Sequence, residues 1–170
     1  MLMKSLLVAG TALALMAATV PAAEAQSRNR VNINQSGYAN ELSARQTGPQ
    51  NRLYIDQRGT YQYVQTIQAG SRNGVTVGQG GHGNAAYADQ LGQRNTAVIG
   101  QEGTHNAASA VQTGRNNTVG VAQIGHGHTA STNQTGTSNS LGVIQVGAGQ
   151  QANVNQSGRG NVALVIQGSH

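Results

Sequence analysis

Polar and apolar residues alternate along most of this 170-residue chain, and the alternation restarts every 11 residues. One copy places four side chains on one face of an extended strand: Asn51, Leu53, Ile55 and Gln57. The other face of that strand carries Arg52, Tyr54, Asp56 and Arg58. Across all copies, positions equivalent to the first face hold no Asp, Glu, Lys or Arg. Because strict alternation with one uncharged face is typical of strands buried on one side, the pattern predicts an all-β fold.

A glutamine and a glycine mark the copies. Thirteen glutamines follow one another at intervals of 11 residues: Gln35, Gln46, Gln57, Gln68, Gln79, Gln90, Gln101, Gln112, Gln123, Gln134, Gln145, Gln156 and Gln167. Twelve of them are followed two residues later by a glycine: Gly37, Gly48, Gly59, Gly70, Gly81, Gly92, Gly103, Gly114, Gly125, Gly136, Gly147 and Gly158. We expect strands of about seven residues that reverse direction at these glycines, because glycine reaches positive φ without a steric penalty.

Alternate copies differ, so the full unit has 22 residues. Six residues before the odd-numbered glutamines the chain always has asparagine: Asn29, Asn51, Asn73, Asn95, Asn117, Asn139 and Asn161. Before the even-numbered ones this position varies: Asn40, Gln62, Asn84, Asn106, His128 and Gln150. Two residues before the odd-numbered glutamines stand bulky β-branched residues: Ile33, Ile55, Val77, Ile99, Val121, Val143 and Val165. The even copies mostly have Ala or Thr there. One strand of each unit is therefore expected to fill the core, and the facing strand to make room for it.

The repeat predicts a β-solenoid of cross-β type, with about six and a half strand-turn-strand rungs that form two facing parallel sheets. Rungs stacked at about 4.7–4.8 Å would place identical residues above one another. Buried Gln and Asn side chains are then expected to form ladders, in which each amide donates to the carbonyl of the next rung. The repeats show no capping segment, so both ends are expected to be open strand edges.

The first 25 residues have the features of a secretory signal peptide. A lone Lys4 precedes an apolar run, residues 6–20, and a small-residue cleavage motif ends at Ala25. The run is too short and too interrupted for a membrane anchor, so we expect no membrane span. Residues 26–28 would then be a short N-terminal segment, and residues 29–170 the repeat region.

Composition argues against a catalytic protein. Beyond residue 25 the chain has nine arginines, four acidic residues and no cysteine, tryptophan or phenylalanine. No catalytic triad, nucleotide loop or carboxylate pair is visible, so we expect neither an enzyme nor a cofactor. The net charge of +5 is suited to attract extracellular DNA, although outward charges also serve to slow premature assembly.

The histidines raise the question of a metal site. His82, His105 and His126 fall on one turn edge, and His126 and His128 form a local pair. Turn positions two rungs apart are expected to lie about 9–10 Å from each other, which is too far for convergent metal ligands. We therefore expect solvated turn histidines and no metal site.

One stretch resembles the motif of the curlin family, which reads Ser-x5-Gln-x-Gly-x-Gly-Asn-x-Ala-x3-Gln. Here the stretch runs Asn73-x5-Gln79-x-Gly81-x-Gly83-Asn84-x-Ala86-x3-Gln90, with Asn in place of the leading Ser. Parts of the motif recur in other copies, at Gln156, Gly158, Gly160 and Asn161 and at Asn106, Ala108 and Gln112. The resemblance covers nearly all of the chain after residue 25.

The resemblance implies a secreted subunit of curli-type amyloid fibres on the surface of a Gram-negative bacterium. Such a subunit would assemble with itself, with a nucleator subunit as partner, and would leave the cell through a dedicated outer-membrane channel. It would serve adhesion and biofilm matrix. Two departures matter. Few residues precede the repeats where the family has a channel-addressing segment, and the basic final repeat of the minor, nucleating subunit is absent. The chain therefore resembles the major subunit more closely, with the minor nucleator as the alternative.

A rival from another class is a monomeric binding solenoid, such as an ice-binding β-helix. Ice binders of this kind tend to show a flat outward column of Thr-x-Thr, and the outward residues here are irregular. A soluble, persistent monomer would favour this rival, and self-seeded fibres would favour the curlin interpretation.

Overall fold

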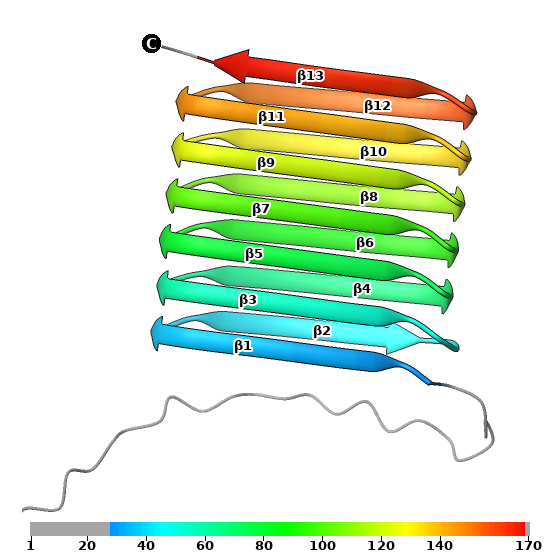
Figure 1. Cartoon of the computed structure of the whole chain (residues 1–170), viewed down its shortest axis with the longest axis horizontal. Helices are drawn as coiled ribbons and strands as arrows, with labels where there is room; N and C mark the ends of the chain where they lie inside the picture. Colours follow the sequence, from blue (N-terminus) through cyan, green and yellow to red (C-terminus); the bar gives the residue numbers. More distant parts are fainter. Residues whose placement is uncertain (1–27, 169–170) are drawn as a thin grey trace, which may run out of the picture.

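The computed structural model describes residues 28–168, and these residues form thirteen β-strands without any helix. The strands are β1 (Arg30–Tyr38), β2 (Glu41–Thr47), β3 (Arg52–Thr60), β4 (Tyr63–Ser71), β5 (Gly74–His82), β6 (Ala85–Gln93), β7 (Thr96–Thr104), β8 (Ala107–Arg115), β9 (Thr118–His126), β10 (Thr129–Thr137), β11 (Ser140–Ala148), β12 (Gln151–Arg159) and β13 (Val162–Gly168). Figure 1 shows them stacked as successive half-turns of one coil. The expected signal peptide lies outside the described residues.

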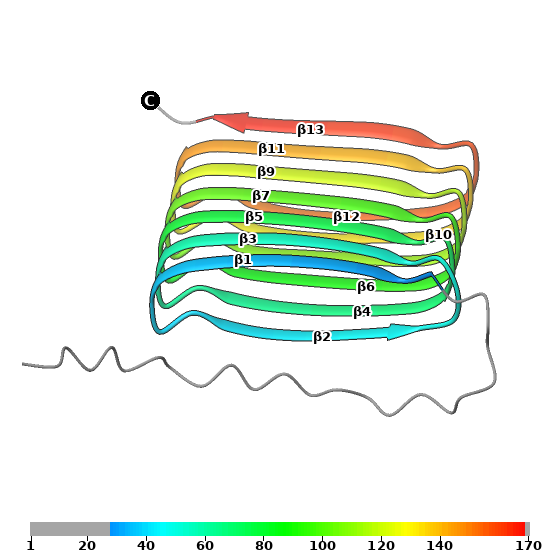
Figure 2. The ribbon, with the colours of Figure 1, turned by 60° about the horizontal axis from the view of Figure 1, so that its bottom comes forward.

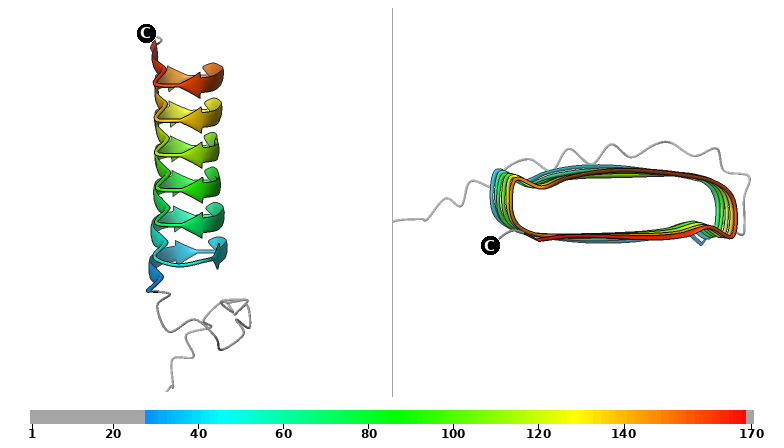
Figure 3. Two further views of the ribbon diagram at one scale, coloured as in Figure 1. Left: turned by 90° about the vertical axis from the view of Figure 1, so that its right-hand side faces the viewer. Right: turned by 90° about the horizontal axis from the view of Figure 1, so that it is seen from above.

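The strands form two parallel sheets that face each other. Odd-numbered strands make a seven-stranded sheet in the order β1-β3-β5-β7-β9-β11-β13, and even-numbered strands make a six-stranded sheet from β2 to β12. Figure 2 shows the two sheets as front and back layers, and the view from above in Figure 3 shows a flattened ring with two long sides. The predicted β-solenoid, with two facing parallel sheets, is confirmed.

Every strand pair has the same register, and it corresponds to the 22-residue unit. In the seven-stranded sheet Gln57 pairs with Gln79, and in the six-stranded sheet Gln68 pairs with Gln90. Because a one-residue slip would turn each buried set outward, the alternation within the repeat fixes this register.

The core is a thin layer of inward side chains between the sheets. On the seven-stranded side, Ile55, Val77 and Ile99 are at most 1% exposed. On the six-stranded side the equivalent residues are small, for example Ala88 and Ala110, which are both fully buried. Side chains of the two sheets belong to one cluster, so bulky residues of one sheet pack against small residues of the other.

The corners between strands differ from the expectation. Eleven of the thirteen strands have nine residues, and every repeated glycine except Gly48 lies inside its strand. The reversal instead needs a second residue with positive φ, four residues after each of the first twelve glutamines, which sequence reasoning missed. Eight of these second residues are not glycine: Ala39, Gln50, Tyr61, Arg72, Arg94, His105, Asn116 and Ser138. Each corner thus combines a bend within the strand at glycine with a left-handed residue just after it.

Candidate functional site

The glutamines form two continuous columns inside the solenoid. Gln79 donates from Nε2 to Oε1 of Gln101 at 2.7 Å, and its own Oε1 accepts from Gln57 at 3.0 Å. The same Nε2 also donates to the backbone carbonyl of Tyr63, on the facing sheet, at 3.1 Å. The columns run from Gln35 to Gln167 in the seven-stranded sheet and from Gln46 to Gln156 in the six-stranded one. Most of the glutamines thus connect their rung both to the next rung and to the opposite sheet.

The asparagines bond differently, and the expected amide-to-amide ladder is wrong for them. Asn73 donates from Nδ2 to the backbone carbonyls of Ala69 and Gly92, at 3.3 and 3.1 Å. Its Oδ1 accepts the backbone N–H of Asn95 at 3.1 Å. The short side chain reaches only the backbone, so each asparagine satisfies the polar groups of a corner that has no strand partner.

This bonding continues through the whole asparagine column of the seven-stranded sheet. Backbone N–H groups of successive rungs donate to the Oδ1 atoms of Asn29, Asn51, Asn73, Asn95, Asn117 and Asn139. Side chain meets side chain only at the last step among the described residues, where Asn161 Nδ2 lies 3.2 Å from Asn139 Oδ1. The column explains why this position does not vary in the odd copies.

The equivalent column of the six-stranded sheet is interrupted. Gln62 is too long to repeat the asparagine geometry, and its Oε1 is buried without a hydrogen-bond partner. Gln150, at the upper end of the column, has neither Oε1 nor Nε2 paired. Buried unpaired polar atoms are costly, so these two positions are the weak points of this column.

His128 occupies the same column, and the expectation of a solvated histidine is wrong for this residue. It is fully buried, and its Nδ1 accepts the backbone N–H of Gln150 at 3.2 Å. The proton therefore resides on Nε2, which lies 3.1 Å from the carbonyl of Ile124 and donates to it. The imidazole reproduces the acceptor and the donor of asparagine. Its position six residues before Gln134 was the signal that it points inward.

The repeated glycines are required by the spacing of the rungs. They have φ between 90° and 126°, a region that favours glycine. A Cβ added to Gly59 would collide with the carbonyl oxygen of Gly81 in the next rung, and the same collision recurs along both columns up to Gly136. Glycine therefore serves close stacking of backbone on backbone as well as the bend.

Aromatic rings form a column along one edge. Sequence reasoning placed His82 and His105 on this edge but missed the tyrosines and the ring contacts. Tyr38, Tyr61, His82 and His105 stack in edge-to-face contacts, with ring centroids 5.3–5.9 Å apart. The rings alternate between three and four residues after the glutamine, so no single column of the repeat displays them. His82 Nδ1 also lies 2.8 Å from the Thr60 hydroxyl. In residues 28–168 no group of three or more potential ligand side chains is placed to hold a metal ion.

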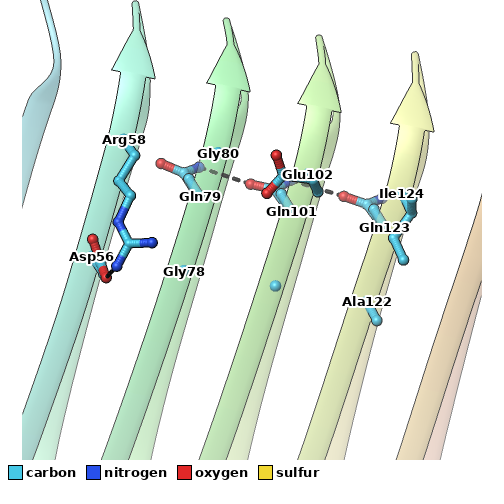
Figure 4. A pocket seen from close by; sticks show the side chains of 11 residues that line it. Asp56, Arg58, Gly78, Gln79, Gly80, Gln101, Glu102, Ala122, Gln123 and Ile124 are labelled. Carbon is cyan, nitrogen blue, oxygen red and sulfur yellow. Dashed lines mark hydrogen bonds and ion pairs between the residues drawn. The ribbon is translucent and has the colours of Figure 1, made fainter. Parts of the chain in front are cut away.

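The outer face of the seven-stranded sheet changes in character along the stack. Near β3 to β7 it has the Asp56–Arg58 ion pair and the Glu102 carboxylate, around a shallow hollow left by Gly78, Gly80 and Gly100 (Figure 4). Farther along, β9, β11 and β13 expose Ile124, Ile144, Val146, Leu164 and Ile166. On the other sheet, partial burial, and then the neighbouring Asp89 carboxylate, raise the pKa of Tyr87. Neither outer face has a regular column that would match a repetitive ligand.

The two ends of the solenoid are open. Among the described residues, β1 and β2 have no strand below them, and β12 and β13 have none above. Inward side chains there remain partly exposed: Ile33, Leu42 and Ala44 at the lower end, and Val154, Ala163 and Val165 at the upper end. Each end therefore combines an unpaired strand edge with inward apolar side chains that are only partly covered.

The ends are also complementary in their hydrogen-bonding groups. Every glutamine with a rung above it donates upward, so the upper end presents the second N–H of the Gln156 and Gln167 amides, whose first N–H groups donate to Ser140 and Gln151. The lower end presents the Oε1 acceptors of Gln35 and Gln46. Upper end on lower end continues both ladders, whereas two like ends would oppose donor to donor or acceptor to acceptor.

Residues 28–168 thus form a parallel β-solenoid whose two ends are complementary. The model of the curlin associated repeat matches the chain twice, over residues 70–103 and 92–125. Residues 70–125 therefore match the curlin associated repeat, which supports the resemblance to the curlin family seen in the motifs. Comparison with curated proteins and with solved structures gives no match. Within the described residues no helix is long and apolar enough to cross a membrane.

Proposed function

We propose that this protein is a secreted structural subunit that assembles head to tail into extracellular, curli-like amyloid fibres. The observation that carries the proposal is the pair of open, complementary ends. A second copy placed on the upper end would pair the edges of β12 and β13, cover Val154 and Val165, and extend both glutamine ladders. Association in this orientation is heterologous and does not close, so it produces a filament.

The curlin repeats support a fibre subunit as against an enzyme, because curlin proteins are structural subunits. Adhesion and biofilm matrix are the roles proposed for the fibre. Export would use the signal peptide expected in residues 1–25 and then an outer-membrane channel, and the mature chain would begin at residue 26. A nucleator subunit is the proposed partner at the start of assembly, and extracellular DNA is a proposed ligand of outward arginines such as Arg52 and Arg58.

The role of major subunit is favoured over that of minor nucleator. The ladders run without a break through all the rungs, so one copy can be added to another without limit. The monomeric binding solenoid is the less favoured function, because its partly exposed end cores would remain in contact with water.

Seeded assembly of residues 26–170 tests the proposal. Protein diluted from denaturant should first be disordered, since one chain buries little apolar area against the entropy lost on ordering. It should then form fibres after a lag that preformed fibres abolish, and aligned fibres should diffract at about 4.7 Å along their axis. A soluble β-rich monomer that persists for days and ignores seeds would refute the fibre and favour the binding solenoid.

A further inference from the structure

The number of strands sets a condition on how one copy can follow another. The seven-stranded sheet has one strand more than the six-stranded sheet, and β13 ends the stack half a rung above β12. The next vacant strand position therefore lies on β12, in the six-stranded sheet. A following copy fills this position only if its β1 adds to β12 and its β2 adds to β13.

We infer that successive copies join with a half-turn about the fibre axis, so that the two sheets exchange roles at every junction. This inference rests on the proposed fibre and specifies the partner surface at each end. The alternative places β1 on β13 without rotation. It would leave one strand position of the six-stranded sheet empty at every junction, and the backbone groups of β12 and of the next β2 would lose their partners.

The core of the last rung suits a junction of this kind. In the central rungs the two strands differ, as where Ala108 and Ala110 of β8 accompany Val119 and Val121 of β9. In the last rung the inward residues are the same in both strands: Ala152, Val154 and Gln156 of β12 and Ala163, Val165 and Gln167 of β13. The upper end therefore presents equivalent core columns on its two sides.

Val154 is the informative member of this set. The other five residues in its column, from Ala44 to Thr132, are Ala or Thr. With the half-turn, Val154 lies directly below Ile33 of the next copy, so a bulky residue supports a bulky residue. Without rotation the same Val154 would face the empty strand position.

Gln150 gives an independent indication. Its amide oxygen and nitrogen are both buried and unpaired at the upper end of the six-stranded sheet. At the lower end of the same column, the side chain of Asn40 accepts the backbone N–H of Gln62 at 3.0 Å. The half-turn places the next copy's Asn29 above Gln150, so this corner is covered instead of facing an empty strand position.

Engineered cysteine pairs distinguish the two junctions, and the natural chain has no cysteine to interfere. The half-turn sets Asn34 of one copy beside Asn155 of the preceding copy, and Arg45 beside Ile166. The unrotated junction sets Asn34 beside Ile166. All four side chains are exposed on outer faces. Paired positions would lie about 4.8 Å apart between Cα atoms, which permits a disulfide, and the unpaired combinations would lie on opposite faces.

Three double variants are needed: Asn34→Cys with Asn155→Cys, Arg45→Cys with Ile166→Cys, and Asn34→Cys with Ile166→Cys. Each is assembled under reducing conditions, verified as fibres by electron microscopy, oxidised, and dissolved for a non-reducing gel. We expect covalent multimers from the first two variants and monomers from the third. Multimers from the third variant alone, or fibres without cross-links in all three, would overturn the half-turn and leave the fibre intact. Failure of the parent protein to form seeded fibres would instead refute the proposed function.

Discussion

The two sheets of the solenoid are built from the same repeat, yet they differ in how well each repeat position is satisfied. In the seven-stranded sheet the corner asparagines form one unbroken column of backbone hydrogen bonds. In the six-stranded sheet the same column contains Gln62, His128 and Gln150, and two of these three leave buried polar atoms unpaired. The difference shows that an amide side chain at this position does not by itself satisfy the backbone groups of the corner. The side chain must place an acceptor and a donor at the distances that the corner backbone sets.

The largest effect is expected from a charge in the bulky core of the seven-stranded sheet. Val77→Asp buries a carboxylate with no partner. Breaking a buried ion pair, which also leaves a buried charge uncompensated, costs roughly 3–5 kcal/mol, and we expect a similar cost here. Fibre growth, followed with seeds of the parent protein, should stop. The adjacent Thr76→Asp is the control, because Thr76 is exposed on the outer face and its carboxylate stays hydrated. Similar growth rates for the two variants would contradict the inward assignment.

A smaller but still large effect is expected at the glycines that both sheets share. Gly103→Ala places a Cβ against the carbonyl oxygen of Gly125 at a φ of 116°, and backbone strain alone costs about 1–3 kcal/mol. Gly149→Ala is the matched variant, since open space surrounds its Cβ and eight other copies have a non-glycine residue at this corner. The guanidinium concentration that dissolves the fibres should fall sharply for the first variant only. An equal fall for both would mean that stacking does not select glycine.

A glutamine in the asparagine column of the seven-stranded sheet tests whether side-chain length causes the difference between the two sheets. Asn95→Gln should reproduce in the seven-stranded sheet the mismatch seen at Gln62, because the longer side chain withdraws the acceptor from the backbone N–H of Asn117. An unpaired buried group costs about 1–3 kcal/mol. Fibres of this variant should dissolve at a lower guanidinium concentration than the parent. Unchanged fibre stability would show that the unbroken column does not depend on side-chain length.

The reverse exchange has the smallest expected effect, and it is a gain. Gln62→Asn removes the unpaired Oε1 and restores an acceptor for the backbone N–H of Asn84, which should add about 0.5–1.5 kcal/mol. The measurement is again the dissolution midpoint, which should rise. Gln50→Asn is a suitable control, because Gln50 is exposed and lies outside the column. A decrease for Gln62→Asn would refute the hydrogen-bonding account of the weak sheet.

Much of the fold follows from the sequence because one rule repeats. Alternation assigns the faces, the 22-residue unit assigns the register, and the contrast of Ile55 with Ala88 assigns bulky and small sides. Hydrogen bonds between side chains and the backbone cannot be recognised from the sequence. The asparagine bonds were mistaken for a side-chain ladder, since composition alone cannot tell which carbonyl an amide reaches. The second left-handed residue of each corner was missed because residues as different as Tyr61, Arg72 and Ser138 adopt it.

Sequence reasoning placed His82 and His105 on one turn edge but missed the tyrosines of the edge column for a related reason. Tyr38 and His82 stand three residues after their glutamines, whereas Tyr61 and His105 stand four after theirs. Periodicity aligns residues by number, but the corner lets two neighbouring positions reach the same edge. Only the three-dimensional arrangement shows that the tyrosines join the histidines in one stack.

The odd number of strands also determines the interval at which equivalent residues would recur along a fibre. Six and a half rungs at about 4.8 Å give each copy an axial length of about 31 Å. A feature that occurs once per copy, such as the Asp56–Arg58 ion pair, would recur at that interval along a fibre. With a half-turn at each junction it would alternate between opposite faces, so any one face would carry it at intervals of about 62 Å. Labels attached to a single outer residue would then form two staggered rows, with a spacing determined by the count of repeats in the chain.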